Sequence, residues 1–210
     1  FEPVTGRAGD TLALTVVSIT NPDFQPDMES TSSYGWYHKT LDSRVELQFN
    51  ADAPAAPSDL PPAREIFSQS DVREEKVTAQ YVENELPKYG WGGVSMDTLD
   101  SGIYYTFSCD GGISYDNLRV SAPVPLQFTM CGTAGTSYSI AFFLDHQPVK
   151  LDESTCRSIT LSKGGVIELE AVLDPDKLGQ FNTFYCVAVP QDGASGPFFK
   201  TNSILLYKEN

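Results

Sequence analysis

Residues 98–107 read Thr-Leu-Asp-Ser-Gly-Ile-Tyr-Tyr-Thr-Phe, and this stretch decides the fold expected for the 210-residue chain. The pattern Asp-Ser-Gly-X-Tyr is typical of a tyrosine corner, where the chain turns between two packed β-sheets and the tyrosine hydroxyl bonds to backbone just upstream. Gly102 suits the bend because it has no Cβ, and Asp100 can hydrogen-bond the local backbone. The stretch therefore predicts a β-sandwich with Tyr104 buried at its corner.

Two patterns upstream fit the same architecture. Residues 9–16 read Gly-Asp-Thr-Leu-Ala-Leu-Thr-Val, in which the two leucines and Val16 alternate along one face of a predicted strand. Twenty residues beyond Val16 comes Trp36-Tyr37, whose indole we expect to pack at the centre of the sandwich. A third run, residues 44–49, alternates again and predicts a strand with Val45, Leu47 and Phe49 inward.

In this order and spacing, residues 9–16, Trp36-Tyr37 and residues 100–104 resemble the motifs of an immunoglobulin-like domain. The resemblance covers residues 1–121. Val16 and Thr106 stand where such domains carry their two disulfide cysteines, so it implies a sandwich without the bond between the sheets. It is closer to modules of bacterial secreted or cell-surface proteins than to antibody or receptor domains.

Ser121-Ala122-Pro123-Val124-Pro125 reads as a linker, because proline blocks strand pairing and stiffens the chain. The strand pattern then restarts, and Lys163-Gly164-Gly165 is followed by a predicted hairpin strand, residues 166–173, with one wet face. The sequence thus predicts an all-β protein of two tandem immunoglobulin-like antiparallel β-sandwich domains, residues 1–121 and 122–210. Residues 71–86 fit a helical face and a strand about equally, and the all-β setting favours a strand with a short helical turn.

The composition narrows the classes of partner. A net charge of −14 repels phosphate backbones and anionic membrane surfaces, so we expect no nucleic acid to bind. No apolar run approaches the roughly 18 residues of a membrane-spanning helix. An export signal is either absent or already removed, and the acidic balance suits a monomer at the cell surface or outside the cell. Buried free thiols and a disulfide stay equally open for the four cysteines, which are Cys109, Cys131, Cys156 and Cys186.

No sequence motif for catalysis is present, so we expect no enzyme activity and no cofactor. Of the two histidines, His38 follows Trp36-Tyr37 on a strand and His146 lies in a predicted turn. Asp110, Asp116 and Asn117 bracket a hairpin and could hold calcium, but turns ordinarily carry such polar residues, and we expect no metal.

The candidate ligand-binding residues are Tyr89 and Trp91, which lie in the glycine-flanked loop Pro87–Gly93. Aromatic side chains in loops stack on sugars or fill a partner's pocket, although Trp91 could also fold back over the edge of the core. We therefore expect a non-enzymatic extracellular or cell-surface module for adhesion, protein interaction or spacing. The alternative is a carbohydrate-binding accessory module that uses these two aromatic residues, so the partner is an unidentified protein or glycan.

Overall fold

The computed structural model confirms that the protein is built from β-strands. It describes residues 6–19, 40–54, 62–76, 84, 103–109, 112–113, 117–163, 165–191, 199–201 and 203–209. The strands are β1 (Thr11–Ile19), β2 (Thr40–Gln48), β3 (Phe67–Lys76), β4 (Ile103–Cys109), β5 (Gly112–Ile113), β6 (Asn117–Val120), β7 (Val124–Gly132), β8 (Ser137–Leu144), β9 (Gln147–Pro148), β10 (Arg157–Thr160), β11 (Gly165–Leu173), β12 (Phe181–Pro190), β13 (Phe199–Lys200) and β14 (Ile204–Lys208). A single 3₁₀ turn, Pro175–Lys177, is the helical element with described bounds.

The chain divides into two compact units, but not at the predicted boundary. The smaller unit comprises residues 1–24 and 37–62, and the larger comprises residues 25–36 and 63–210. The predicted division at residues 121 and 122 is wrong, because strands on its two sides pair with one another. β3 pairs with β11, β4 pairs with β7, and β6 runs parallel to β14.

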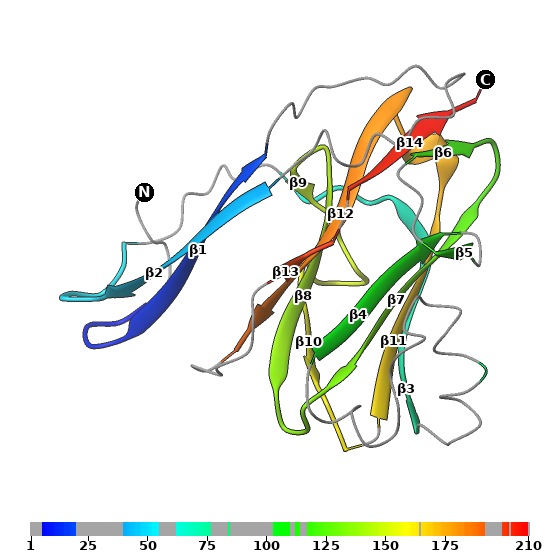
Figure 1. Ribbon diagram of the computed structural model, residues 1–210. Helices are drawn as coiled ribbons and strands as arrows, with labels where there is room; N and C mark the ends of the chain where they lie inside the picture. Colours follow the sequence, from blue (N-terminus) through cyan, green and yellow to red (C-terminus); the bar gives the residue numbers. More distant parts are fainter. Residues whose placement is uncertain are drawn as a thin grey trace. The chain divides into compact units, whose positions relative to one another are not determined.

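In the smaller unit β1 and β2 form an antiparallel ribbon (Figure 1). Leu12 lies opposite Leu47 and Leu14 opposite Val45, so these apolar side chains share one face. Val16 is 52% exposed and Val45 is 46% exposed, which contradicts the expectation that both point into a sandwich core. The physical reason is that an inward position needs a second sheet over the same face, whereas β1 is paired with β2 alone among the described strands.

Phe49 follows the end of β2 and is buried. Its ring lies against the backbone of Gly6. Gly6 has φ +133°, and a Cβ added there would meet the Phe49 ring at 2.6 Å. We expect Gly6→Ala to weaken this end more than Gly9→Ala, because Gly9 (φ +92°) has open space around its Cα. Backbone strain of about 1–2 kcal/mol is common to both substitutions, and the clash is added at Gly6 only.

Amide hydrogen exchange measures this difference directly. The Ala53 amide donates to the Gly6 carbonyl and the Phe49 amide donates to the Asp10 carbonyl. Both amides should lose more protection in Gly6→Ala than in Gly9→Ala. Equal protection in the two variants would show that the packing of the Phe49 ring does not require a residue without a Cβ at position 6.

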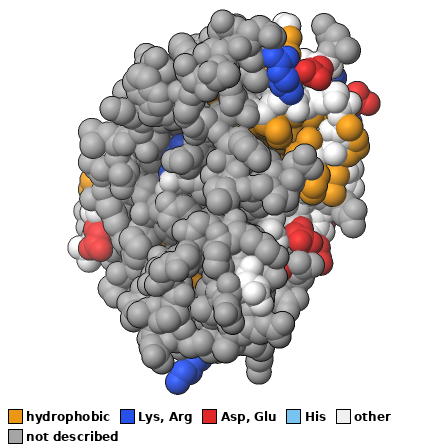
Figure 2. Space-filling model, turned by 45° about the vertical axis from the view of Figure 1, so that its right-hand side comes forward, with side chains coloured by type: hydrophobic (Ala, Val, Ile, Leu, Met, Phe, Trp, Pro, Cys, Tyr) orange, Lys and Arg blue, Asp and Glu red, His pale blue; other side chains and the backbone are white. Residues whose placement is uncertain are grey.

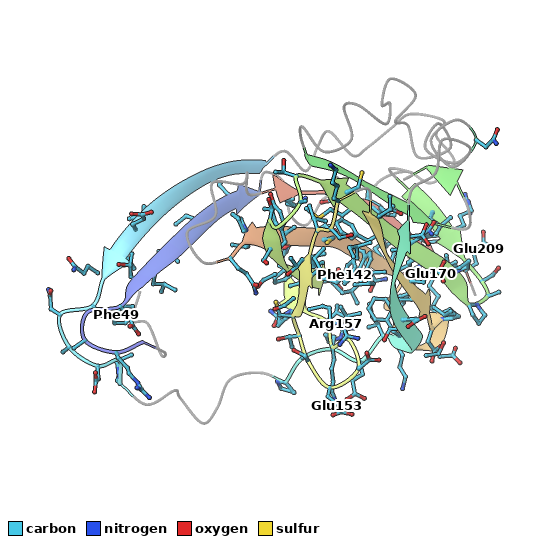
Figure 3. All side chains as sticks on the ribbon, turned by 90° about the horizontal axis from the view of Figure 1, so that it is seen from below. Phe49, Phe142, Glu153, Arg157, Glu170 and Glu209 are labelled. Atoms are coloured by element: carbon cyan, nitrogen blue, oxygen red, sulfur yellow. The ribbon has the colours of Figure 1, made fainter. Side chains whose placement is uncertain are left out.

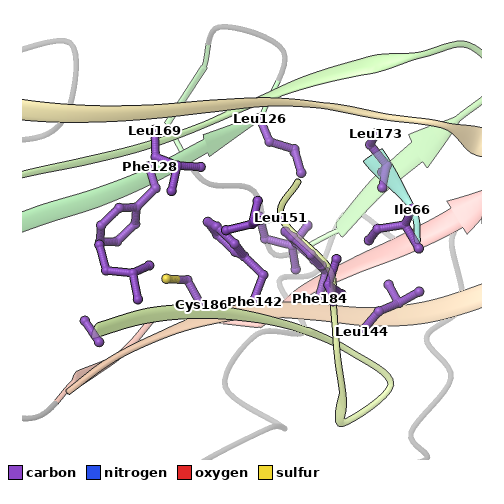
Figure 4. Close-up of a cluster of buried hydrophobic side chains, with 14 of the residues drawn as sticks. Ile66, Leu126, Phe128, Phe142, Leu144, Leu151, Leu169, Leu173, Phe184 and Cys186 are labelled. Atoms are coloured by element: carbon purple, nitrogen blue, oxygen red, sulfur yellow. The ribbon is translucent and has the colours of Figure 1, made fainter. Parts of the chain in front are cut away.

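The larger unit contains two sheets packed face to face (Figure 1). One is five-stranded in the order β3-β11-β7-β4-β5, and the other has the path β10-β8-β12-β14-β6, with β13 beside β12 and β9 beside β8. Figure 4 shows side chains of both sheets meeting in the space between them. The largest fully buried side chains are Tyr138, Phe128, Phe142, Phe184, Ile66, Met130, Ile140, Leu144, Leu161 and Leu169.

The last two residues of the predicted linker, Val124 and Pro125, instead begin β7 of the five-stranded sheet. Pro125 lies within β7 opposite Val172 of β11. On its other side β7 pairs with β4 only from Leu126 onward. Among the described residues Pro125 therefore faces a neighbouring strand on one side only, and a sheet tolerates a residue without an N–H at such a position.

β11 has the predicted wet face only in its second half. Ile167 and Leu169 face the core, and on the other face Val166 (0% exposed) and Glu168 (3% exposed) are buried too, whereas Glu170 and Val172 are partly exposed. β11 is also no hairpin partner of the preceding β10, which belongs to the other sheet. The chain therefore passes from one sheet to the other between the end of β10 and the start of β11.

Several predicted features fall outside the described residues. Trp36 is among them, as are Asp100–Gly102 of the predicted corner. Tyr104 lies in β4 with its Cα opposite that of Cys131, and its side chain is not described. Of the ambiguous stretch 71–86, residues 71–76 belong to β3, so this part is a strand as favoured.

Candidate functional site

The structure tests few of the site residues predicted from the sequence. Tyr89, Trp91, His38, Asp110 and Asp116 all lie outside the described residues, and Asn117 is described only as a backbone position of β6. His146 lies in a tight turn between β8 and β9, as predicted. Within the described ranges no helix has the length and apolar character needed to cross a membrane.

The strongest concentration of functional side chains lies on the outer face of the sheet that contains β12. Along β12, Phe184 and Cys186 point into the core, so the alternating positions Phe181 and Tyr185 point outward. Tyr185 lies opposite Phe143 of β8, and Phe181 lies opposite Tyr207 of β14. The ring centroids are 5.3 Å apart in the first pair and 5.0 Å apart in the second. We call these four residues the aromatic row.

The Tyr185 end of the aromatic row carries two further groups. Lys200 places its Nζ 4.4 Å from the centroid of the Tyr185 ring, and His146 Nδ1 lies 3.2 Å from the Tyr185 hydroxyl oxygen. Lys200 Nζ also donates to the Thr201 carbonyl (2.9 Å) and to Ser203 Oγ (3.0 Å). A lysine beside a serine hydroxyl can act as a general base, but Ser203 is only 1% exposed and so cannot meet a substrate in this state.

The turn that presents His146 is held in a conformation that most residues avoid. Asp145 (φ +50°) and His146 (φ +64°) are both left-handed, as the two-residue turn between paired strands requires. Two hydrogen bonds secure it to β12: the Asp145 amide donates to the Thr183 carbonyl, and the Thr183 amide donates to Asp145 Oδ1, each at 2.8 Å. These contacts offset the backbone strain and fix the imidazole beside Tyr185.

Burial shifts the acid–base properties of this cluster. It lowers the pKa of the Lys200 ammonium to about 8, because the charged form loses hydration. Burial raises the pKa of the Tyr185 hydroxyl to about 12 for the same reason. Near pH 7 the tyrosine is therefore neutral and the lysine is partly deprotonated.

The Tyr207 end is charged and more open. Arg119 of β6 lies over the Tyr207 ring, 5.6 Å from its centroid, and its Nη1 is 3.1 Å from Glu209 Oε1. Both charged side chains are 39% exposed. An aromatic ring flanked by a guanidinium and a carboxylate can stack on a ligand and bond its polar groups at the same time.

A second, polar concavity lies where β3 meets the segment after β9. It is lined by Glu65, Phe67, Ser68, Ser70, Lys150 and Asp152. Lys150 Nζ is 3.1 Å from Glu65 Oε1, and Ser70 Oγ donates to Asp152 Oδ1 at 2.5 Å. The Arg157 guanidinium also pairs with Asp152, at 3.1 Å, and Figure 3 shows Glu153 at the lower edge of the view. The charged side chains of this concavity already pair with one another, Lys150 with Glu65 and Asp152 with Arg157. The concavity is therefore a weaker candidate for a binding site than the aromatic row.

Cys186 is a buried free thiol and Cys156 is an exposed one, whereas Cys131 is buried in the core of the larger unit. Burial raises the pKa of Cys186 well above its usual value, so this thiol is unreactive. In the part of the chain that the structure describes, no three His, Cys, Asp or Glu side chains gather as metal ligands would.

Sequence reasoning missed the aromatic row. A strand pattern does not say which neighbouring strands lie beside it, so the pairs that β12 forms with β8 and β14 cannot be inferred from the sequence. The signal that was present is the alternation of Phe181 and Tyr185 on the face opposite Phe184 and Cys186. In Figure 2, which shows one face of the molecule, hydrophobic side chains gather beside both acidic and basic ones, so mixed surfaces of this kind are exposed on the described part.

Comparison with known proteins adds no family. No protein-family model matches the chain, and no curated protein sequence matches it either.

Proposed function

We propose that this protein is a non-enzymatic extracellular or cell-surface module for adhesion, protein interaction or spacing, and that the Tyr207 end of the aromatic row is its contact surface. The observation that carries the proposal is the pair of Phe181 and Tyr207, which are partly exposed on one outer sheet face with Arg119 over the Tyr207 ring. Tyr185 at the other end of the row is only 6% exposed and so lies outside this surface. Aromatic residues and arginine are enriched where proteins bind one another. The row is held by regular strands, so little order is lost on binding.

The topology of residues 117–208 supports an immunoglobulin-like assignment for this part of the chain. β7 and β11 are neighbours in one sheet, and β8, β12 and β14 follow one another in the other. This is the arrangement of the B–E and C–F–G strands of an immunoglobulin sandwich. The resemblance to bacterial secreted modules then carries the proposed exterior location, which the acidic composition favours as well. β3 and β4, from the first half of the sequence, extend the B–E side of this sandwich.

The second candidate function is carbohydrate binding, and the Tyr207 end of the row favours it. Sugars stack on aromatic faces and hydrogen-bond with charged planar groups, and Tyr207 offers both through Arg119 and Glu209. This site differs from the one predicted at Tyr89 and Trp91, which stays a prediction.

Binding assays on two panels distinguish these functions. The full chain is tested against an array of defined oligosaccharides and against immobilised collagen, fibronectin and fibrinogen. The test variant combines Phe181→Ala and Tyr207→Ala, and the matched control combines Ser158→Ala and Thr160→Ala on β10 of the same sheet. We expect saturable protein binding that weakens at least about tenfold in the test variant, since interface aromatics contribute about 2 kcal/mol or more each, and that persists in the control.

Three other binding results would contradict protein adhesion through the aromatic row. Oligosaccharide binding that is lost in the test variant would replace protein adhesion by the carbohydrate function. Oligosaccharide binding lost in Trp91→Ala but kept in the test variant would move the site to the predicted loop. Binding that is equal in the test and control variants would remove the aromatic row as the contact surface.

A further inference from the structure

The outer edge of β1 differs in composition from the other long sheet edges. The described strands of four or more residues at sheet edges are β1, β2, β3, β6 and β10. The last four each contain at least one charged residue, and charge at an open edge keeps other strands from pairing there. β1 reads Thr-Leu-Ala-Leu-Thr-Val-Val-Ser-Ile and contains none. Since β1 pairs with β2 alone among the described strands, its second edge is a long, uncharged template for strand pairing.

The hydrogen bonds of the ribbon show which backbone groups lie along this edge. The Phe49 amide donates to the Asp10 carbonyl at 2.9 Å, and the register continues with Thr11 opposite Gln48. Hydrogen-bonded and non-hydrogen-bonded pairs alternate in an antiparallel ladder, so every second residue after Asp10 bonds to β2. The residues between them direct their N–H and C=O groups away from β2. These residues are Thr11, Ala13, Thr15, Val17 and Ile19.

We propose that β1 is a dimerisation edge, which pairs antiparallel with β1 of a second copy of this chain about a two-fold axis at Thr15. Thr15 is the middle residue of β1, so this register pairs all nine residues of the strand. The outward backbone groups of the two copies then face one another, with Thr15 bonded to its own counterpart and Ala13 bonded to Val17 of the second copy. Such an interface uses the same surface on both chains, so it closes at two copies.

The side chains of the ribbon fit the same register. Leu14 lies opposite Val16 of the second copy, so the apolar positions of both chains continue on one face of a four-stranded sheet. Val16 and Val45 on that face are the exposed large apolar side chains among the described residues, at 52% and 46%. A shift by one residue would set Leu14 against Thr15 and would misalign the backbone groups as well. Four strands are also more stable than an isolated two-stranded ribbon.

A second copy fits this edge better than a foreign strand. An uncharged strand offers no charge pattern for a different protein to recognise, whereas self-pairing satisfies the backbone groups, the register and the apolar face together. The dimer uses the smaller unit and no residue of the aromatic row. The inference therefore does not depend on the proposed contact surface.

Sedimentation equilibrium of the full chain tests the dimer. We choose about 0.15 M salt, where repulsion between charges more than about 8 Å apart is largely screened, and expect the share of dimer to rise with concentration. Thr15→Glu sets two carboxylates against each other at the axis and should weaken dimerisation about fivefold or more relative to Thr15→Gln, its uncharged match. Within each ribbon residue 15 lies opposite Arg44, so the carboxylate suits the ribbon itself. A wild type that stays monomeric up to about 1 mM, or equal dimerisation of the two variants, would overturn the proposal.

Cysteine crosslinking tests the register. Thr15→Cys brings two thiols together at the axis, where the Cα separation of about 5.5 Å suits a disulfide. Ser18→Cys is the matched control, because in this register its two thiols lie about 20 Å apart along the strands. Both variants carry Cys156→Ser, since Cys156 is exposed. We expect Thr15→Cys to form covalent dimers at least about tenfold faster than Ser18→Cys under mild oxidation, and a rate at Thr15→Cys no higher than at Ser18→Cys would contradict pairing about Thr15.

Discussion

Replacing Phe142 by alanine is expected to lower the free energy of unfolding by about 3–5 kcal/mol, the usual range for deleting a core aromatic side chain. Phe142 is 2% exposed and lies between the two sheets of the larger unit (Figures 3 and 4). Its ring stacks on Phe184 at 5.7 Å and meets the edges of Phe67 and Phe128 at 6.0 Å and 6.4 Å. Its removal therefore leaves a cavity bordered by three aromatic rings from three different strands, which cannot close by a small shift.

Phe143→Ala is the matched control, because the adjacent side chain points to the outer face and is partly exposed. It should cost about 1–2 kcal/mol through the lost stacking on Tyr185. Urea denaturation followed by far-ultraviolet circular dichroism measures both variants. Equal losses for Phe142→Ala and Phe143→Ala would mean that the packed interior does not lie between these two sheets.

The second large effect is a dependence of stability on alkaline pH that originates at Lys200. Its pKa is about 8 in the folded protein, lowered by burial from an ordinary value of 10.5. Between these two values the unfolded chain holds the proton and the folded chain does not, so the free energy of unfolding rises with pH. The contribution is present above pH 10.5 and is lost as the pH falls through 8, and over the whole interval it amounts to about 3 kcal/mol.

Tyr185 acts in the opposite direction at higher pH. Burial raises its folded pKa to about 12, so its contribution to stability is present below pH 10 and is lost as the pH rises toward 12. The pair should therefore produce a maximum of stability near pH 10. Substitution separates the contributions of Lys200 and Tyr185. Lys200→Met should remove the rise in the free energy of unfolding between pH 8 and 10 and leave its fall above pH 10.

Urea denaturation at pH 7, 8, 9 and 10 measures this prediction. The stability difference between the wild type and Lys200→Met should change by about 2.5 kcal/mol in favour of the wild type as the pH rises from 7 to 10. Lys177→Met replaces an exposed lysine and should run parallel to the wild type. If Lys200→Met also ran parallel, the ammonium would be as well hydrated in the folded protein as in the unfolded chain.

Individual strands were predictable because the pattern that marks them is local. The alternation in residues 9–16 and 44–49 predicted what became β1 and β2, and the turn at His146 was predicted from its polar residues. The all-β class followed from many such short runs separated by glycine and proline. None of this depended on which strand lies beside which.

The predicted boundary after residue 121 failed because two prolines were interpreted from composition alone. A proline disrupts a sheet only where a neighbouring strand would accept a hydrogen bond from the missing N–H. Among the described residues the pairing of β4 with β7 begins at Leu126, so Pro125 lies just outside it. The prediction that Val16 faces a core was wrong for a related reason. Alternation shows that a strand has an apolar face, but it does not show that a second sheet covers that face.

The sequence alone predicted the all-β class, several of the strands and the turn at His146, since these depend on residues close together in the chain. The tertiary structure was needed to show that β3 and β4 extend a sheet of the second half, that β6 lies parallel to β14, and that Tyr185, Lys200 and His146 share one outer face. Residues 146, 185 and 200 meet because sheet pairing joins segments far apart in the chain. The free energy of that pairing comes from burying both inner faces at once, which no single run of residues records.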